Sequence, residues 1–203
     1  ICIYMTKKKR PTLQDVADRV GVTKMTVSRY LKDPAQVSAA AGEKIAQALD
    51  ELGYIRNRAP DILSNAKSHA IGVLLPSLTN QVFAEVLRGI EQVTEAAGYQ
   101  TMLAHYGYSA KVEEERIASL LSYNVDGLIL SESYHTARTL KMIQTAGVPV
   151  VEIMDVCSSC IEQAVGIDNI AAARAMVEAM IARGYRHIVY LGARQDVRTL
   201  QRQ

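Results

Sequence analysis

Apolar residues recur at helical spacing near the start of the chain. One such pattern, at i, i+3, i+4 and i+7, is formed by Leu13, Val16, Ala17 and Val20. Thr12 is a suitable N-cap before this pattern, Asp15 stands where a capping box has its acid, and Gly21 follows its end. The pattern therefore predicts a short amphipathic helix with a marked start and a marked stop.

Two more helices are predicted directly after it. Thr23 is a good N-cap for a helix over residues 24–31, and Asp33-Pro34 breaks the chain. Ser38 is an N-cap for a third helix, which Gly53 closes. One face of this third helix carries Ile45, Leu49 and Leu52.

The first two helices have the spacing of a helix-turn-helix. Gly21 stands where the turn favours a positive φ, and Ala17 is small where the helices approach closely. The positions that share a core are apolar, namely Val16, Val20, Val22, Val27 and Tyr30. A plain three-helix bundle is the alternative, but a generic helical hairpin rarely meets all of these constraints at once.

From residue 70 onward, unbroken apolar runs alternate with helical patterns. Strands are predicted at 71–75, 99–105, 126–130, 148–154 and 187–191, and helices at 80–97, 111–123, 137–146 and 169–183. Continuous apolar strands between helices are typical of a parallel sheet covered on both faces. The predicted fold is therefore an all-α helix-turn-helix head at 7–55, a polar hinge and linker at 56–69, and an α/β parallel-sheet domain at 70–203.

Composition narrows the class of protein. Charged residues make up 22% and hydrophobic residues 49%, which excludes a disordered chain, and no apolar run is long enough to span a membrane. Three cysteines do not make a disulfide framework, so a cytoplasmic location is expected. The net charge of +2 divides unevenly, since residues 1–70 carry +5 and residues 71–203 carry −3. A basic head favours a polyanionic partner such as DNA.

The second predicted helix carries the candidate DNA chemistry. It presents Thr23, Lys24, Met25, Thr26, Ser28, Arg29 and Lys32. Arg29 is suited to two hydrogen bonds with guanine, and Met25 to a thymine methyl group. Thr23, Ser28, Lys32 and Ser38 suit phosphate, and the basic run Lys7–Arg10 adds attraction that does not depend on base sequence.

Evidence for other chemistry is weak. Cys157 and Cys160 have the spacing of a redox pair or half a zinc site, but no second pair accompanies them and the four histidines are scattered. Glu113–Glu115 are interpreted as the solvated start of a helix. Phosphate-loop, dinucleotide-binding and serine-nucleophile motifs are missing. We therefore expect no metal, no cofactor and no enzymatic activity.

These residues together resemble the lactose/galactose repressor (LacI/GalR) family. In the head and linker the resemblance rests on Leu13–Ala17, Gly21–Thr23, Thr26–Arg29, Val37-Ser38, Leu52–Ile55 and Asn57-Arg58. In the body it rests on Ile71–Val73, Asp126–Ile129, Val165–Asn169 and Arg183–Ile188. It covers nearly the whole chain after Met5. It implies a sequence-specific repressor whose core lobe is like a periplasmic sugar-binding protein.

The resemblance implies roles for individual residues in DNA binding. Lys24 and Met25 take the positions that distinguish operators, and Arg29 the arginine beside them. Asn57 lies in the linker, and Leu63 stands where the hinge helix of the family inserts between base pairs in the minor groove. Arg56 departs from the family, which commonly has proline there, so we expect a less rigid linker.

The resemblance also implies an effector pocket between two lobes. The positions carried over are Val82, Phe83, Asp155, Asp196, Arg198 and Arg202. Two arginines suit the carboxylate of a sugar acid such as gluconate. The implied partners are operator DNA and, in the full-length form, a gluconate-like effector and a second copy of the chain in a homodimer, with no membrane.

The second lobe is expected to be incomplete in this chain. We therefore expect Phe83 and Asp155 to face solvent, and the chain to be largely monomeric with weak operator binding that gluconate hardly changes. Two alternatives remain open. One is a small-molecule enzyme or solute-binding protein, and the other is an interaction-only fragment that pairs with full-length repressor subunits.

Overall fold

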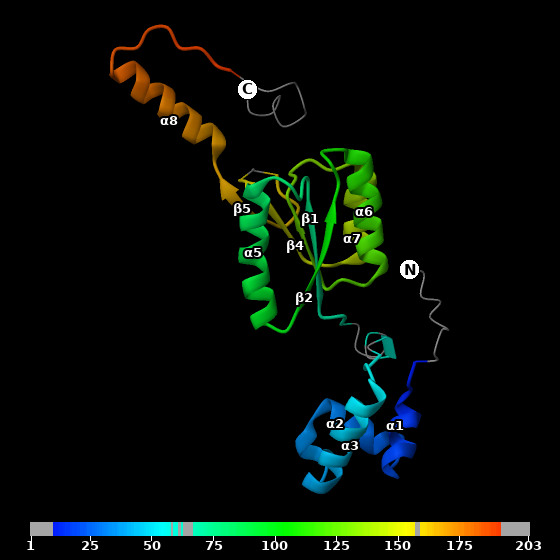
Figure 1. Ribbon diagram of the computed structural model, residues 1–203. Coiled ribbons are helices and arrows are strands. Elements are labelled where there is room, and N and C mark those ends of the chain that lie inside the picture. Colours follow the sequence, from blue (N-terminus) through cyan, green and yellow to red (C-terminus); the bar gives the residue numbers. More distant parts are fainter. Residues whose placement is uncertain (1–9, 58, 61, 63–66, 157–158, 192–203) are drawn as a thin grey trace, which may run out of the picture. The chain divides into compact units, whose positions relative to one another are not determined.

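The computed structural model describes residues 10–57, 59–60, 62, 67–156 and 159–191. The chain divides into two compact units, Ile1–Pro60 and Asp61–Gln203 (Figure 1). Each unit has its own hydrophobic core, so the two are considered one at a time.

The first unit is helical and follows its sequence signals closely. It contains α1 (Leu13–Val20), α2 (Lys24–Lys32), a 3-10 turn η1 (Pro34–Gln36) and α3 (Ala39–Leu52). Thr12 and Asp15 form a complete capping box at the start of α1, and Gly21 ends that helix with a φ of 79°. All three helices therefore begin at the predicted caps, and only η1 was not expected from the sequence.

One buried cluster holds the three helices together. Its fully buried members are Val16 and Ala17 of α1, Val27 of α2 and Ile45 of α3. The remaining predicted core positions, Val20, Val22 and Tyr30, pack around them half-buried. The core predicted for a helix-turn-helix is thus confirmed.

The second unit is built on a five-stranded parallel sheet. Its strands are β1 (Ala70–Leu75), β2 (Gln100–His105), β3 (Gly127–Leu130), β4 (Val150–Asp155) and β5 (Gln163–Ile167). They lie in the order β2-β1-β3-β4-β5, and every neighbouring pair is parallel. The helices of this unit are α5 (Gln81–Ala96), α6 (Ala110–Ser122), α7 (Ala137–Ala146) and α8 (Asn169–Ala182).

Helices cover both faces of the sheet, as the apolar strands predict. Figure 1 shows α5 on one face and α6 beside α7 on the other. Alternate residues of β1 enter the two layers, because successive side chains of a strand point to opposite faces. Leu74 packs with Ile117 of α6 and Ile143 of α7, whereas Val73 and Leu75 pack with Phe83 of α5.

The end of the described chain differs from the prediction. β5 was missed, because this strand begins with a polar residue, contains Gly166 and leaves Val165 65% exposed, so it lacks the apolar pattern of a covered strand. The strand predicted at 187–191 is wrong. A strand needs a neighbour to accept and donate backbone hydrogen bonds, and no described residue pairs with this segment.

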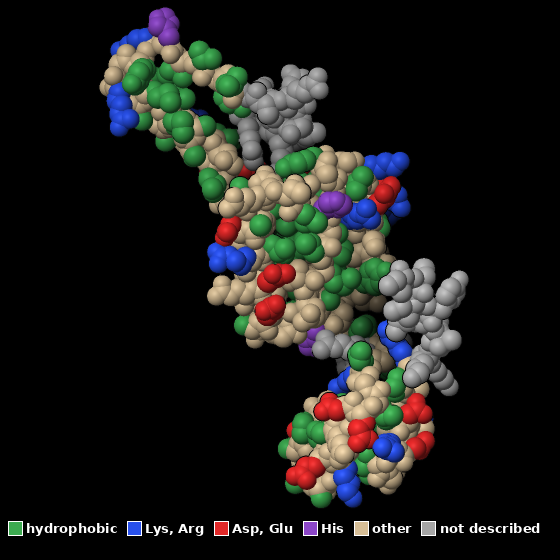
Figure 2. Space-filling view, in the orientation of Figure 1, with side chains coloured by type: hydrophobic (Ala, Val, Ile, Leu, Met, Phe, Trp, Pro, Cys, Tyr) green, Lys and Arg blue, Asp and Glu red, His purple; other side chains and the backbone are tan. Residues whose placement is uncertain are grey.

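Helix α8 is apolar but has no buried residue within the described chain. Figure 2 shows hydrophobic side chains gathered over it, and its large exposed members are Ile170, Met176, Val177, Met180 and Ile181. No helix among the described residues is long and apolar enough to cross a membrane.

An aspartate fixes the point where the linker enters the second unit. One carboxylate oxygen of Asp126 accepts hydrogen bonds from the backbone N–H and the hydroxyl of Ser68, at 2.8 and 3.1 Å. The other oxygen accepts from the backbone N–H of His69 at 3.0 Å. Backbone N–H of Asp126 in turn donates to the carbonyl of Ala70. Hydrogen bonds to an ionised group are among the stronger ones in proteins, so this contact anchors the chain just before β1.

Candidate DNA interface and ligand cleft

Helix α2 carries the candidate DNA interface, and its cap and its core residue orient it. The hydroxyl oxygen of Thr23 accepts a hydrogen bond from the backbone N–H of Thr26 at 3.2 Å, which satisfies one free donor at the start of the helix. Val27 is fully buried against α1 and α3. Burial of that side of the helix turns the opposite side outward.

The outward face of α2 carries the predicted DNA-binding side chains. Exposed members are Thr23, Lys24, Met25, Ser28, Arg29 and Lys32. Met25 is 61% exposed, which confirms that it is not a core residue. Thr26 is half-buried, with its hydroxyl 3.0 Å from that of Thr23. Within the described part of the chain, neither a hydrogen bond nor a salt bridge engages the side chains of Lys24, Ser28, Arg29 or Lys32.

This face has the chemistry of a groove-reading helix. It contains three cations, and α2 has neither Asp nor Glu along its length. Arg29 offers a fork of N–H donors that matches the acceptors of guanine, and Met25 beside it offers an apolar contact. A face of this kind offers cations to a polyanion and hydrogen-bond donors to base edges at a few positions.

Two other predicted residues act as caps at the boundaries of local structure. Ser38 is the N-cap of α3, where its hydroxyl accepts from the backbone N–H of Ala41 at 3.4 Å. The side-chain oxygen of Asn57 accepts from the backbone N–H of Ala59 at 3.0 Å. Both side chains are exposed. Leu63, the predicted minor-groove residue, lies outside the described residues.

Arg56 contacts the head in a way that the sequence did not suggest. Its guanidinium donates a hydrogen bond to the backbone carbonyl of Leu31 at 2.9 Å, near the end of α2. That carbonyl is one of the last of the helix and lacks a partner within it. The residue that replaces the usual proline therefore ties the linker to the helix that carries the candidate interface.

A cleft in the second unit lies where three neighbouring strands end. It has a volume of about 540 Å³. Its walls include Ser133 and Tyr134 after β3, Asp155 at the end of β4, and Asp168 and Asn169 after β5. Arg174 and Glu178 of α8 also line it. The carboxyl ends of parallel strands are the usual place for a ligand in an open α/β sheet.

Of the three predicted effector residues that the structure describes, Val82, Phe83 and Asp155, one lines this cleft. Asp155 lines it and accepts a hydrogen bond from the side-chain amide of Asn169. Val82 is 53% exposed in the first turn of α5 but does not line the cleft. The expectation that Phe83 faces solvent is wrong, since its side chain is 3% exposed and packs on β1. Asp196, Arg198 and Arg202 lie outside the described residues.

Sequence reasoning missed several lining residues. Ser133 and Tyr134 lie in the segment that follows the predicted strand at 126–130, and that position was the available signal. Arg174 lies on an exposed helix with no motif to mark it. A polar residue in a helix carries no information about which cleft it lines.

Directly after Ser133 and Tyr134 in the chain, a buried histidine lies between two carboxylates. Nδ1 of His135 is 2.9 Å from Glu113 and Nε2 is 3.3 Å from Glu152. All three side chains are 1% exposed. Burial by itself lowers the pKa of His135, but the hydrogen bond and charge of Glu113, and then those of Glu152, outweigh it, so this pKa is raised.

The interpretation of Glu113–Glu115 as a solvated helix start is therefore wrong for the first two residues. Glu113 is buried, and Glu114 accepts hydrogen bonds from the hydroxyl of Thr136 at 2.5 Å and the guanidinium of Arg138 at 2.9 Å. Only Glu115 is exposed. The first turn of α6 is thus attached to the loop before α7, and the acids are structural.

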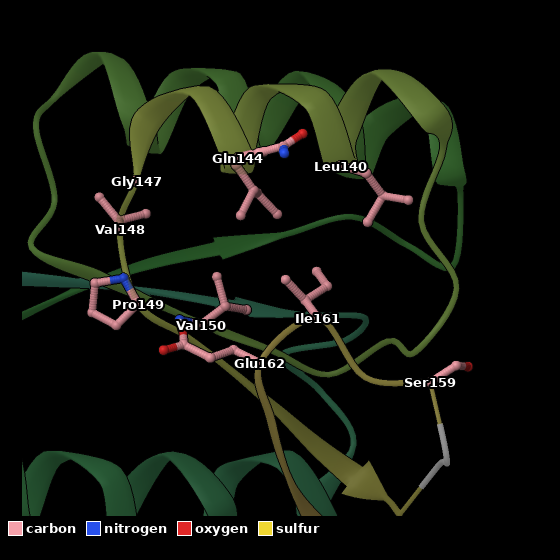
Figure 3. Close-up of a pocket in the computed structure, with 10 residues that line it drawn as sticks. Leu140, Gln144, Gly147, Val148, Pro149, Val150, Ser159, Ile161 and Glu162 are labelled. Carbon is pink, nitrogen blue, oxygen red and sulfur yellow. Dashed lines mark hydrogen bonds between the residues drawn. The ribbon is translucent and has the colours of Figure 1, made fainter.

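A second hollow, of about 650 Å³, lies between α7 and the start of β4 (Figure 3). Leu140 of α7, Val148 and Ile161 give it an apolar lining, and the side chain of Glu162 accepts a hydrogen bond from the backbone N–H of Val150 at 2.8 Å. Cys160 nearby is a free thiol, and Cys157 lies outside the described residues. The described residues contain no group of three or more His, Cys, Asp or Glu that could hold a metal ion.

Both units match known family models. Residues 12–57 match "Bacterial regulatory proteins, lacI family". Residues 68–202 match "Periplasmic binding proteins and sugar binding domain of LacI family". The chain is 73% identical over 197 residues to the HTH-type transcriptional regulator GntR of Escherichia coli strain K12. The aligned region covers 97% of this chain and 60% of that protein. The chain thus spans about 60% of the length of this relative.

Solved structures show the same fold. A LacI-family transcriptional regulator from Silicibacter pomeroyi is 38% identical, with a TM-score of 0.78, over 87% of this chain and 53% of that one. The lac repressor dimer bound to operator and the anti-inducer ONPF is 28% identical, with a TM-score of 0.73, over 87% of this chain and 54% of that one. The two units therefore correspond to elements that occur together in transcriptional regulators.

Proposed function

The chain belongs to the LacI family of bacterial regulatory proteins, and from that premise we propose that it is a sequence-specific, DNA-binding transcriptional repressor. The observation that supports this most directly is the outward face of α2, which carries three cations, no acid and an exposed methionine. A repressor needs a helix that can enter the major groove with its polar donors unpaired. It acts on DNA and therefore works in the cytoplasm, without catalysis.

In this proposal the residues of the head have different roles in DNA binding. Arg29 and Met25 read base edges, and Lys24 contributes to the choice of operator. Thr23, Thr26, Ser28, Lys32 and Ser38 hold the phosphates on either side. Asn57 and Leu63 belong to the linker, which we propose folds on DNA and contacts the minor groove.

We propose that the second unit binds a sugar acid of the gluconate type. Binding of this effector would relieve repression of the genes whose products metabolise the sugar acid. The GntR name of the Escherichia coli relative and the cleft at the carboxyl ends of β3, β4 and β5 support this proposal. Asp155 would accept hydrogen bonds from sugar hydroxyls, and Arg174 would bind the carboxylate. Arg198 and Arg202, which lie outside the described residues, are proposed to bind the carboxylate as well. Val82, Phe83 and Asp196 remain proposed contributors, Phe83 through the packing of α5. We propose a homodimer as the DNA-binding form, as in the lac repressor dimer on operator.

The DNA-binding role is tested with duplexes selected from a random pool by the 203-residue chain. Arg29→Ala should weaken binding to the selected duplex by about 1–3 kcal/mol, and binding to a scrambled duplex by less. Fluorescence anisotropy measures both. Arg116→Ala is the matched control, because it removes the same exposed group from α6 in the second unit. Equal losses on both duplexes for Arg29→Ala would remove the base-reading role.

The effector role is tested by calorimetric titration with gluconate, with glucose as the uncharged comparison. We expect gluconate to bind and glucose to bind more weakly, because only the acid carries a carboxylate for the arginines. Asp155→Asn should weaken gluconate binding, whereas Asp50→Asn on the exposed side of α3 should leave it unchanged. Absence of gluconate binding would contradict this part of the proposal and leave the DNA-binding part standing.

A further inference from the structure

The histidine between Glu113 and Glu152 is placed so that both of its ring nitrogens face carboxylates. A neutral imidazole has one N–H donor and one lone pair. With two ionised carboxylates, a neutral ring would set its lone pair against a carboxylate oxygen. Both ring nitrogens are satisfied only when a proton lies between each nitrogen and its carboxylate, while the second oxygen of Glu113 is buried without a hydrogen-bond partner among the described residues. The group therefore retains one proton more than a neutral histidine with two ionised glutamates.

Other charged groups near this site are already engaged. From α6, Glu114 is held by Thr136 and by Arg138 of α7. Glu132 of the same loop accepts from the hydroxyl of Tyr106 at 3.2 Å. Glu162 is bonded to the backbone of Val150. Glu113, His135 and Glu152 form a buried group whose side chains are all 1% exposed, and His135 is the single cation within it. If His135 loses its proton, two buried carboxylates face a ring that can donate a hydrogen bond to only one of them.

The same group holds two segments that line the cleft. His135 follows Ser133 and Tyr134 directly, and its two bonds fix the end of that loop between α6 and β4. The second oxygen of Glu152 accepts from the backbone N–H of Ile161 at 2.7 Å. That bond restrains the segment that also carries Ser159, another lining residue of the cleft. The buried carboxylate of Glu152 therefore contacts both lining segments, the one that ends at His135 and the one that contains Ser159.

We propose that Glu113, His135 and Glu152 form a proton-dependent clamp that positions the cleft loop and makes ligand affinity fall as pH rises. His135 acts through Ser133, Tyr134 and Ser159 and is a positioning residue. While the proton is present, both segments are held and the cleft keeps its shape. When it is lost, repulsion between the ring and a carboxylate favours release of the loop. The ligand part of this proposal rests on the proposed function, whereas the clamp does not.

The clamp is tested with Tyr134→Trp, because the chain has no tryptophan of its own and the probe reports on the loop alone. Its emission in the 203-residue chain, followed from pH 6 to 9, should change with a single midpoint that lies above the usual pKa of histidine, about 6.5. Adding His135→Gln should abolish that change, and adding His187→Gln, at an exposed histidine, should leave it. Circular dichroism checks that each variant is folded. A pH-dependent change that persists in His135→Gln would overturn the proposal.

Glu113→Gln gives a second, independent arm. Glutamine keeps an oxygen that can accept from Nδ1 but removes the charge, so the midpoint should shift to lower pH. This arm also decides the case in which the unsubstituted clamp holds its proton up to pH 9. If Glu113→Gln brings no midpoint into the range and moves none, the clamp proposal is wrong. Glu115→Gln is the matched control, since Glu115 is exposed on the same turn.

Ligand affinity is measured by gluconate titration at pH 6.5 and pH 8.5. A sugar-acid carboxylate stays ionised over this range, so its own charge does not change. We expect binding to weaken several-fold at the higher pH, and this difference to vanish in His135→Gln but not in His187→Gln. A pH effect of equal size in both variants would overturn the link to affinity. Absence of gluconate binding at either pH would count against the proposed effector, while the fluorescence result would still decide the clamp.

Discussion

Among single residues, His135 and Gly72 show how the packing of the second unit depends on neighbours that are far away in the sequence. His135 lies 22 residues from Glu113, and no local pattern connects them. An acid in the first turn of a helix is ordinarily explained by the helix dipole and by solvent. The burial of Glu113 follows instead from the packing of the loop before α7 onto α6, which requires knowledge of the fold.

The raised pKa of His135 predicts how stability depends on pH. The folded state binds its proton more tightly than the unfolded state, whose histidine has a pKa of about 6.5. This contribution to the free energy of unfolding is therefore full below pH 6.5 and is lost as pH rises through the folded-state pKa. Urea unfolding of the 203-residue chain from pH 6 to 9 should show that decline. In His135→Gln the decline should disappear, and an unchanged slope would contradict the assignment.

Gly72 in β1 is required by the close approach of its neighbours. A Cβ atom there would lie 2.8 Å from Leu128 and 3.1 Å from Leu120. Gly72→Ala should therefore lower the free energy of unfolding by about 1–3 kcal/mol through overpacking. Gly89→Ala on α5 is the matched control, because its Cβ meets nothing within 4 Å and alanine favours a helix by about 1 kcal/mol. Denaturant unfolding should thus show opposite signs for the same substitution.

Among the elements, the helices were predicted accurately, whereas the strands near the end of the described chain were not. Caps such as Thr12, Thr23 and Ser38 are local signals, and the helices they begin start where predicted. A strand depends on a partner. Residues 187–191 have an apolar sequence but no strand partner among the described residues, whereas β5 has a weaker apolar pattern but pairs with β4. The candidate DNA face was predictable because one helix carries it, and the cleft was not because separate strand ends build it.

The anchor of the linker on β1 can be tested at Asp126. Asp126→Ala removes the acceptor for two backbone donors and one hydroxyl, so the free energy of unfolding of the second unit should fall by about 2 kcal/mol. Cleavage of the chain before β1 by a protease should also become faster. Asp168→Ala removes the N-cap acceptor of the exposed helix α8 and is the comparison. Equal effects of the two changes would contradict a specific anchor.

Across the whole molecule, charge is distributed unequally along the chain. Residues 1–70 carry a net charge of +5 and residues 71–203 a net charge of −3. Under the proposed function, a positive head favours DNA binding, and a negative body does not compete for the DNA. The electrostatic part of DNA binding should therefore reside in the head and in the basic run that precedes α1.

Salt dependence measures that part directly. Replacing Lys7, Lys8 and Lys9 by alanine should weaken binding to selected and scrambled duplexes alike. The slope of log K against log salt concentration should decrease by about one for each lysine that contacts phosphate. Anisotropy titrations between 50 and 200 mM salt test this expectation. A loss confined to the selected duplex would mean that these lysines read sequence.

The anchor at Asp126 also sets a length. Arg56 donates to Leu31 and Ser68 to Asp126, so residues 57–67 are the stretch of chain that joins these two attachments. Fully extended, these eleven residues reach about 40 Å, and eight of them wound into a helix would shorten that reach by roughly 15 Å. Half-sites for paired reading helices recur about 34 Å apart. Inserting glycines after Asn57 should therefore broaden the half-site separations that two copies tolerate, which would separate control of operator spacing by the linker from the proposed reading of operator sequence by α2.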